Sequence, residues 1–149
     1  MEISLQQVVK IANNRDYSLM TLIYDGTQEW NDNPRSNVYK IGKYCVKYYI
    51  RDARDFRTEV KNLNTLERES CSFAPKLWYS DPDGKFIIME YIEGVSLGKY
   101  GTQNLNSNQQ KQLSEIKEKL ESLKIYYEKE DFDCLVEANG ELRFVDYNI

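Results

Sequence analysis

The chain has 149 residues, of which 41% are hydrophobic and 13% aromatic, and its formal net charge is −4. This length suits one hydrophobic core, so we expect a single domain. The slight acidity and the lack of a long run of like charges argue against binding to a nucleic-acid backbone. We see neither a membrane span nor a secretory signal core, and therefore expect a cytoplasmic protein, in the host cytoplasm if a phage or virus encodes it.

The residue types limit the chemistry of the chain. It contains no histidine, which excludes a Ser-His-Asp triad, a Cys-His pair and His-ligated metals. Cys45, Cys71 and Cys134 are odd in number and far apart, which fits neither a disulfide framework nor a zinc pair. We expect three reduced thiols, most of them buried. Catalysis would have to depend on carboxylates, lysine or a cofactor.

The first part of the chain predicts a helix followed by three strands. Apolar side chains recur at helical spacing in residues 5–12, which indicates an amphipathic helix. Residues 17–24 are typical of a strand, and residues 25–37 of a loop rich in turn formers. Two strands joined by a tight turn follow at 37–41 and 43–50. Three successive strands indicate an antiparallel meander.

The second part predicts two helices and four strands. We expect a helix from Asp52 to about Glu69, then strands at 73–80 and 85–92 joined by the turn DPDG. A polar loop precedes a helix capped by Ser107, and residues 134–145 form a hairpin on an Asn-Gly turn. The inward face of the last helix comprises Leu113, Ile116, Leu120 and Leu123. This α+β order favours an antiparallel sheet with an inserted helix.

Two charged residues fall at positions that the pattern makes apolar. Lys47 lies in a strand with apolar side chains on both faces, and Glu59 lies within the apolar stripe of the next helix. Buried charges are costly unless they are paired, so we expect Lys47 and Glu59 to contact each other. The alternative is that Lys47 extends to solvent from an edge strand and Glu59 lies at the rim of the stripe.

A resemblance to the protein-kinase-like fold rests on four stretches, which are CVKYY, DFRTEVKNL, APKLWYSDPDGKFIIMEYIEGVSL and FVDY. It depends on their order and spacing, and runs from about residue 37 to residue 149. It implies an N-lobe of about residues 1–93, in which an antiparallel sheet carries the inserted helix. It also implies a truncated C-lobe of about residues 94–149, with one helix and a β-hairpin.

The resemblance also implies roles for individual residues. In the family a strand lysine holds the nucleotide phosphates, a helix glutamate orients that lysine, and an aspartate in a D-F-G-type turn holds Mg²⁺. These roles would fall to Lys47, Glu59 and Asp146. Further contacts with ATP would come from Cys45 beside the adenine and from the hinge at residues 89–92, here through Glu90 and Ile92.

The sequence departs from the family pattern in the loop that covers the phosphates. The family uses glycines there, because backbone amides must approach the phosphates closely. The corresponding residues 30–41 contain none. Arg35 and Ser36 are side chains that can contact phosphate instead; alternatively, the loop does not close over a nucleotide.

A second group of departures concerns the catalytic loop. Aligned on Cys134, the chain has Glu128 at the position of the catalytic base and Asp133 at that of the second metal ligand. A carboxylate is a suitable ligand for Mg²⁺, whereas Glu128 places its carboxylate on a longer side chain. The alternative is a solvated acidic turn. The activation segment and the helices of the substrate platform would be missing, which leaves a protein substrate little surface to dock on.

The sequence is compatible with three functions. The first is a minimal ATP- and Mg²⁺-dependent phosphotransferase that acts on a hydroxyl group of a protein or small molecule. The second is an inactive, pseudokinase-like module that binds a protein partner or forms a homodimer through its aromatic residues. The third is a small α+β protein without a nucleotide site. No interaction with nucleic acid or membrane is expected.

Overall fold

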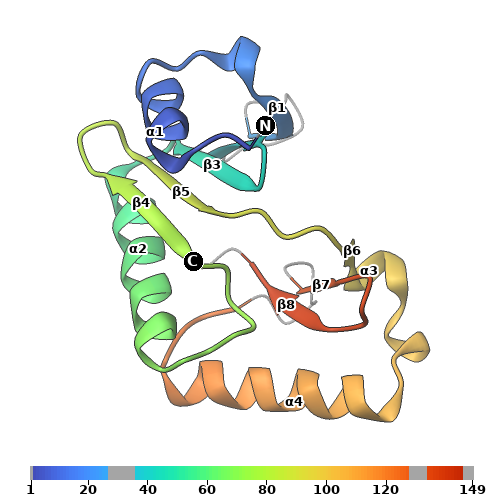
Figure 1. Ribbon diagram of the computed structural model, residues 1–149. Coiled ribbons are helices and arrows are strands. Elements are labelled where there is room, and N and C mark those ends of the chain that lie inside the picture. The colour runs from blue at the N-terminus through green and yellow to red at the C-terminus, as the bar shows by residue number, and fades with distance from the viewer. Residues whose placement is uncertain (1, 27–35, 128–133, 146–149) are drawn as a thin grey trace. The chain divides into compact units, whose positions relative to one another are not determined.

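The computed structural model describes residues 2–26, 36–127 and 134–145 (Figure 1). The fold is α+β, as predicted, with an antiparallel sheet, helices and a small hairpin. It divides into two compact units. The first contains the described parts of Met1–Lys61 and Lys76–Tyr91, and the second those of Asn62–Pro75 and Ile92–Tyr147. Among the described residues, no helix combines the length and the apolar character needed to cross a bilayer.

The first unit is built on a five-stranded sheet in which every neighbouring pair is antiparallel. In order across the sheet, its strands are β1 (Thr21–Asp25), β2 (Ser36–Ile41), β3 (Tyr44–Tyr49), β5 (Phe86–Glu90) and β4 (Leu77–Asp81). All six residues of β3 are buried, because β3 is the central strand. Helix α2 (Ala53–Arg68) connects β3 to β4, which is the inserted helix predicted from the sequence.

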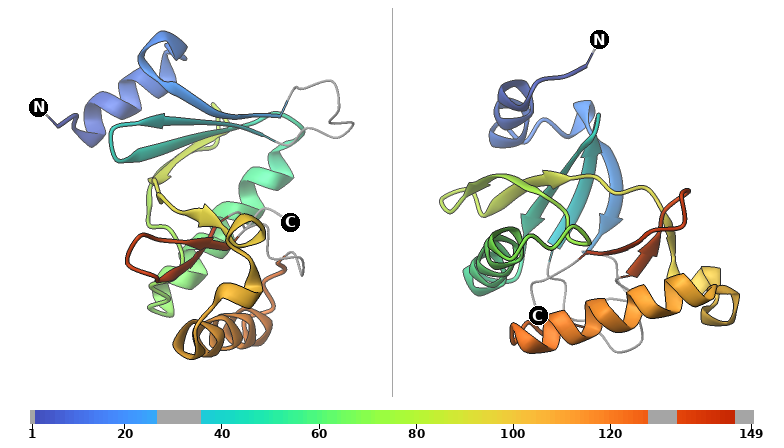
Figure 2. Two further views of the ribbon diagram at one scale, coloured as in Figure 1. Left: turned by 90° about the vertical axis from the view of Figure 1, so that its right-hand side faces the viewer. Right: turned by 60° about the horizontal axis from the view of Figure 1, so that its bottom comes forward.

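Helix α1 (Leu5–Asn13) covers one face of this sheet (Figure 2). It begins with a capping box, in which the side chains of Ser4 and Gln7 each accept a hydrogen bond from the other residue's backbone N–H. Val8 and Ala12, both fully buried, belong to the same hydrophobic cluster as Val46 and Ile88 of the sheet. We call this the outer face of the sheet. The opposite, inner face carries Lys47.

The strand predicted at 17–24 begins later than expected. Residues Tyr17–Leu19 form a 3₁₀ turn, η1, in which the backbone N–H of Met20 donates to the carbonyl oxygen of Tyr17. The Tyr17 ring stacks on Tyr39 at 5.1 Å between centroids, which fixes this turn over the outer face. Aromatic stacking therefore overrides the strand pattern at Tyr17, and β1 pairs with β2 only from Thr21 onward.

The second unit contains a small antiparallel sheet and helix α4. Its elements are β6 (Val95–Ser96), α3 (Leu97–Tyr100), η2 (Thr102–Asn104), α4 (Ser107–Ser122), β7 (Cys134–Val136) and β8 (Leu142–Phe144). The sheet order is β6-β7-β8. Gln109 and Gln112 of α4 donate side-chain hydrogen bonds to the carbonyl oxygens of Gly140 and Leu142, so α4 lies along the hairpin.

In this unit the predicted cap of α4 was wrong, whereas the predicted hairpin is present. The cap of α4 is Asn106 rather than Ser107, since the Asn106 Oδ1 accepts the backbone N–H of Gln109 at 2.8 Å. The hairpin turns at Asn139 and Gly140, as predicted, and its loop is longer than two residues. The N–H of Gly140 donates to the carbonyl of Glu137, and Gly140 has a φ of +88°, which is the geometry of a longer turn with a glycine bulge.

Candidate functional site

The inner face of the sheet brings several of the predicted site residues together. In the antiparallel register, Lys47 of β3 lies opposite Val38 of β2 on one side and opposite Ile87 of β5 on the other. These three side chains therefore share a face of the sheet. Cys45 shares this face as well, two residues before Lys47 on β3. Lys47 therefore projects from a central strand among apolar neighbours, on the face opposite the one that α1 covers.

Lys47 and Glu59 form a buried ion pair. The Lys47 Nζ lies 2.7 Å from the Glu59 Oε1, and the side chains are only 4% and 0% exposed. The alternative, in which Lys47 reaches solvent from an edge strand and Glu59 lies at a rim, is therefore wrong. The contact exists because α2 follows β3 closely and presents its buried face, which carries Phe56, Glu59 and Leu63, at helical spacing.

Tyr49 adds a third polar group to the pair, which sequence reasoning missed. Its hydroxyl donates a hydrogen bond to the same Glu59 Oε1 that receives Lys47. The signal was present in the sequence, because Tyr49 lies two residues after Lys47 and hence on the same face of the strand. One carboxylate oxygen is thus shared by an ammonium and a phenol in a buried environment.

The beginning of α2 is held by a second ion pair. Arg51 Nη2 lies 2.6 Å from Asp55 Oδ1, and Arg51 Nε donates to Asp55 Oδ2 at 3.0 Å. Asp52 accepts the backbone N–H groups of Arg54 and Asp55, so two of the first amides of the helix are satisfied. These contacts fix where α2 starts after β3. They therefore help to determine where Glu59 lies relative to Lys47.

Cys45 is a buried, neutral thiol. Burial raises the pKa of the Cys45 thiol to about 12, and the nearby ammonium of Lys47 offsets only part of this increase. Such a thiol is almost entirely protonated at neutral pH, and only the thiolate is an effective nucleophile. Cys45 therefore offers a small apolar surface beside Lys47 and no nucleophile.

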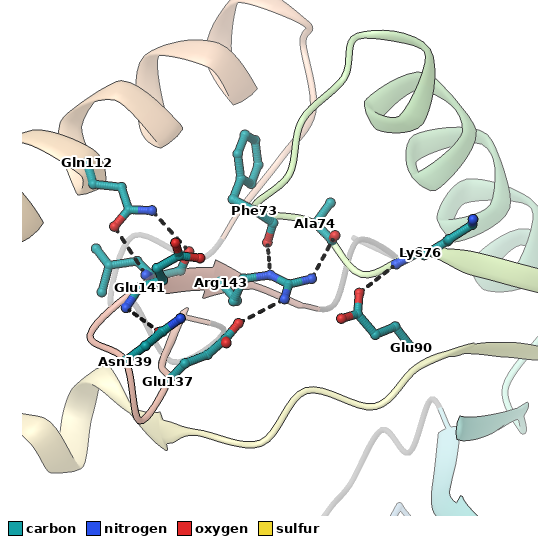
Figure 3. Close-up of polar contacts among 10 residues, drawn as sticks. Phe73, Ala74, Lys76, Glu90, Gln112, Glu137, Asn139, Glu141 and Arg143 are labelled. Carbon is teal, nitrogen blue, oxygen red and sulfur yellow. Dashed lines mark hydrogen bonds and ion pairs between the residues drawn. The ribbon is translucent and has the colours of Figure 1, made fainter. Parts of the chain in front are cut away.

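The structure places the other three described site residues, Ser36, Glu90 and Ile92, in three different environments. Ser36 is 5% exposed and lies opposite Tyr49 on β2, so it shares the inner face. The Glu90 side chain accepts the backbone N–H of Lys76 at 3.2 Å, which ties the end of β5 to the segment before β4 (Figure 3). Ile92 is buried in the second unit.

A glycine that the sequence analysis did not single out lies where β1 ends. A Cβ atom on Gly26 would lie 2.3 Å from the carbonyl oxygen of Ser36, so the two strands approach too closely there for any side chain. The backbone N–H of Gly26 donates to Asn37 Oδ1 at 2.8 Å. The signal was an isolated glycine between a strand and a loop, which is typical of a close backbone approach.

Four predicted site residues lie outside the described residues. These are Arg35, Glu128, Asp133 and Asp146. Within the described ranges, no group of three or more cysteine, aspartate or glutamate residues is arranged to hold a metal ion.

The strand that leads toward residue 146 is held by Arg143 (Figure 3). Its guanidinium lies 2.8 Å from Glu137 Oε1 and donates to the carbonyl oxygens of Ala74 and Phe73 at 3.1 and 3.4 Å. The backbone N–H of Phe144 donates to the carbonyl of Phe73 as well. Strand β8 is therefore fastened to the segment that follows α2.

Comparisons with known proteins identify the fold. No protein-family model matches the sequence, and no curated protein sequence matches it. A structure of the bifunctional kinase-methyltransferase WbdD matches with a TM-score of 0.55 and 14% identity, over 83% of this chain and 32% of that one. The apo form of PpkA-294 matches with a TM-score of 0.59 and 8% identity, over 85% and 56% respectively.

Identities this low establish the fold alone. The chain spans 32% of the WbdD chain and 56% of the PpkA-294 chain, so it corresponds to only part of each. The described residues therefore have a kinase-like fold, with a five-stranded antiparallel sheet, an inserted helix and a small hairpin.

Proposed function

We propose that the chain is a minimal, ATP-binding phosphotransferase that transfers phosphate to a hydroxyl group of a protein or small molecule. The observation that carries the proposal is the buried Lys47–Glu59 pair on the inner face of a kinase-like sheet. A buried ion pair is seldom more stabilising than apolar residues of the same volume. A charge pair at the centre of the sheet is therefore better explained by binding an anionic ligand than by stability.

In this proposal, the side chains of the inner face bind the nucleotide. Lys47 holds its phosphates by charge, and Glu59 keeps the ammonium in place. Cys45 provides apolar contact for the adenine base, and Glu90 and Ile92 belong to the segment that lies along the adenine edge. Arg35 and Ser36 contact the phosphates in place of glycine amides.

The proposal also assigns three carboxylates that lie outside the described residues. Asp133 and Asp146 would hold Mg²⁺, because carboxylate oxygens are the ligands that this hard cation prefers. The bound ion would neutralise negative charge on the phosphates. Glu128 would accept the proton of the attacking hydroxyl group.

The test is a thermal unfolding measurement with and without ATP and Mg²⁺. Ligand at a hundred times its dissociation constant stabilises a protein by about 2.7 kcal/mol, which shifts the midpoint by several degrees at this size. We expect a Mg²⁺-dependent shift that Lys47→Met and Asp146→Asn abolish. Lys111→Met is the matched control, because Lys111 is 77% exposed on α4. No shift in the wild-type protein at millimolar nucleotide would overturn the proposal.

A second candidate is a pseudokinase-like module that binds another protein, and one observation favours it. Strand β1 ends the order of the five-stranded sheet, and Leu22 and Ile23 on it are 50% and 46% exposed. Exposed apolar side chains on a terminal strand favour pairing with another strand. The occupant we propose is a second copy of the chain, since antiparallel pairing centred on Ile23 places Asp25 opposite Thr21 and no like charges meet.

Sedimentation velocity over a range of concentrations tests this second candidate. A dimer that Ile23→Lys dissociates, with no nucleotide-dependent thermal shift, would favour the binding module over the enzyme. A wild-type protein that stays monomeric at hundreds of micromolar would exclude the pairing of two copies.

A further inference from the structure

We infer that Tyr49 is a positioning residue, whose hydroxyl group fixes Glu59 and, through Glu59, the ammonium of Lys47. The functional meaning of this inference rests on the nucleotide-binding role proposed above for Lys47. The effect of Tyr49 on the positions of Glu59 and Lys47 does not depend on that role. It is tested by a measurement that needs no nucleotide.

The geometry begins with strand β3. Lys47 and Tyr49 are two residues apart, so both side chains project from the inner face. The Tyr49 hydroxyl donates to Glu59 Oε1, and the Lys47 Nζ lies 2.7 Å from the same oxygen. The Lys47 Nζ also lies 5.6 Å from the centroid of the Tyr49 ring. Lysine, tyrosine and glutamate thus form one cluster in which each side chain contacts the other two.

Tyr49 itself is held from two further sides. Its ring meets the Phe56 ring edge to face, with centroids 5.7 Å apart and an interplanar angle of 87°. Phe56 lies one helical turn before Glu59 on α2, so the Tyr49 side chain contacts two positions on one side of that helix. The Tyr49 backbone N–H donates to the carbonyl of Lys85 at 2.9 Å. The Tyr49 side chain is therefore held in place, and its hydroxyl group can orient the carboxylate of Glu59.

The hydroxyl matters because glutamate is a flexible side chain. Each added donor on its carboxylate limits the rotamers that Glu59 can adopt, and a carboxylate confined in this way confines the ammonium that pairs with it. Without the hydroxyl, Glu59 would keep one donor fewer, and Lys47 would spend more time away from its position. Tyr49 thus pre-organises the lysine that the proposed function uses to hold phosphate.

The experiment compares Tyr49→Phe with Tyr48→Phe. Tyr48 is the preceding residue on the same strand, it projects from the outer face, and its hydroxyl donates to the carbonyl of Ala12 at 2.7 Å. Both variants lose one buried hydroxyl and its hydrogen bond, but only Tyr49→Phe changes the cluster around Lys47. If either variant is unstable at the working temperature, both are measured in sucrose, which favours the folded state.

The first readout is the rate at which an amine-reactive ester acylates Lys47 in the folded protein, followed by mass spectrometry of peptides. This rate reports how often the ammonium leaves its pair, and it requires no nucleotide. We expect labelling of Lys47 to be about tenfold faster in Tyr49→Phe, which corresponds to about 1.4 kcal/mol, and unchanged in Tyr48→Phe. Equal rates in the wild-type protein and both variants would overturn the inference.

The second readout is the affinity for ATP and Mg²⁺ measured by calorimetry. Tyr49→Phe is expected to weaken binding by about tenfold, whereas Tyr48→Phe leaves it unchanged. If the wild-type protein binds nucleotide and Tyr49→Phe binds it equally well, Tyr49 is not a positioning residue for that site. If the wild-type protein binds no nucleotide, the proposed function fails, and the labelling rate alone decides the role of Tyr49.

Discussion

Arg143 of strand β8 lies 2.8 Å from the carboxylate of Glu137, on the other side of the same hairpin. Their side chains are 13% and 23% exposed, so water screens the pair only in part. The same guanidinium also donates to the backbone carbonyls of Phe73 and Ala74. Arg143 therefore joins three separate segments, and its planar, forked donor set is what allows it to do so.

Replacement of Arg143 by lysine is expected to destabilise the protein although the charge is kept. An ammonium group cannot donate to Glu137 and to two carbonyls in the geometry of a guanidinium. We expect the free energy of unfolding in urea to fall by about 1 to 2 kcal/mol. Lys111→Ala is the control, because Lys111 and Glu115 form an exposed pair and its loss should cost less than about 0.5 kcal/mol. Equal effects of the two substitutions would show that Arg143 acts only as a charge.

Removal of Lys47 alone is expected to be more harmful than removal of the whole cluster around it. Lys47→Met leaves the buried carboxylate of Glu59 without its ammonium, which costs about 3 kcal/mol or more. The triple variant Lys47→Met, Glu59→Met, Tyr49→Phe leaves no polar group of the cluster unsatisfied, and it should recover most of this loss. Urea unfolding of the three proteins tests the prediction. A triple variant less stable than Lys47→Met would contradict it.

The stability of the protein should decline at alkaline pH. The Cys45 thiol has its pKa raised by burial from 9.0 to about 12 in the folded state. Between these values the thiol ionises in the unfolded chain and stays protonated in the folded one, so the unfolded state binds fewer protons and the free energy of unfolding falls as the pH rises. Burial also raises the pKa of Tyr48, which acts in the same direction.

Cys45→Ala isolates the contribution of the thiol. One such group changes the free energy of unfolding by up to about 1.4 kcal/mol per pH unit. The slope between pH 9 and pH 12 should therefore be smaller in Cys45→Ala than in the wild-type protein, whatever the variant loses in packing. Parallel curves would show that Cys45 ionises alike in both states.

Gly26→Ala is expected to destabilise the pairing of β1 with β2. The new Cβ would lie 2.3 Å from the carbonyl oxygen of Ser36, and a backbone atom cannot move away as the end of a side chain can. We expect a loss of about 1 to 3 kcal/mol, measured as the change in urea midpoint. Asn37→Ala, which removes the hydrogen bond to Gly26 without a clash, should cost about 1 kcal/mol. Wild-type stability in Gly26→Ala would contradict the close approach.

The sequence predicted the main features of the first unit well. The α+β class, the meander, helix α2 at Ala53–Arg68 and the contact between Lys47 and Glu59 follow from periodicity and from the cost of a buried charge. These are local patterns repeated over many residues. The expected alternation also explains why Tyr49 shares a face with Lys47, although only the structure showed that its hydroxyl reaches Glu59.

Features set by distant contacts could not be predicted. Strand β6, Val95–Ser96, is two residues long and shows no period, and it exists because Val95 pairs with Val136. The Tyr17–Leu19 turn depends on Tyr39, and the role of Arg143 depends on carbonyl groups about 70 positions away. The functional roles assigned to Lys47, Glu59 and the other site residues stay predictions, which the measurements above test.

The covering of the sheet by α1 has a consequence for synthesis. Val8 and Ala12 pack in one cluster with residues as far along the chain as Ile88. At about 5 to 20 residues per second, a ribosome needs several seconds to supply that partner after it has made α1. During this interval the apolar stripe of α1 can meet Val46 of β3 but not the β5 part of the cluster, so the nascent chain should be most dependent on chaperones before β5 emerges.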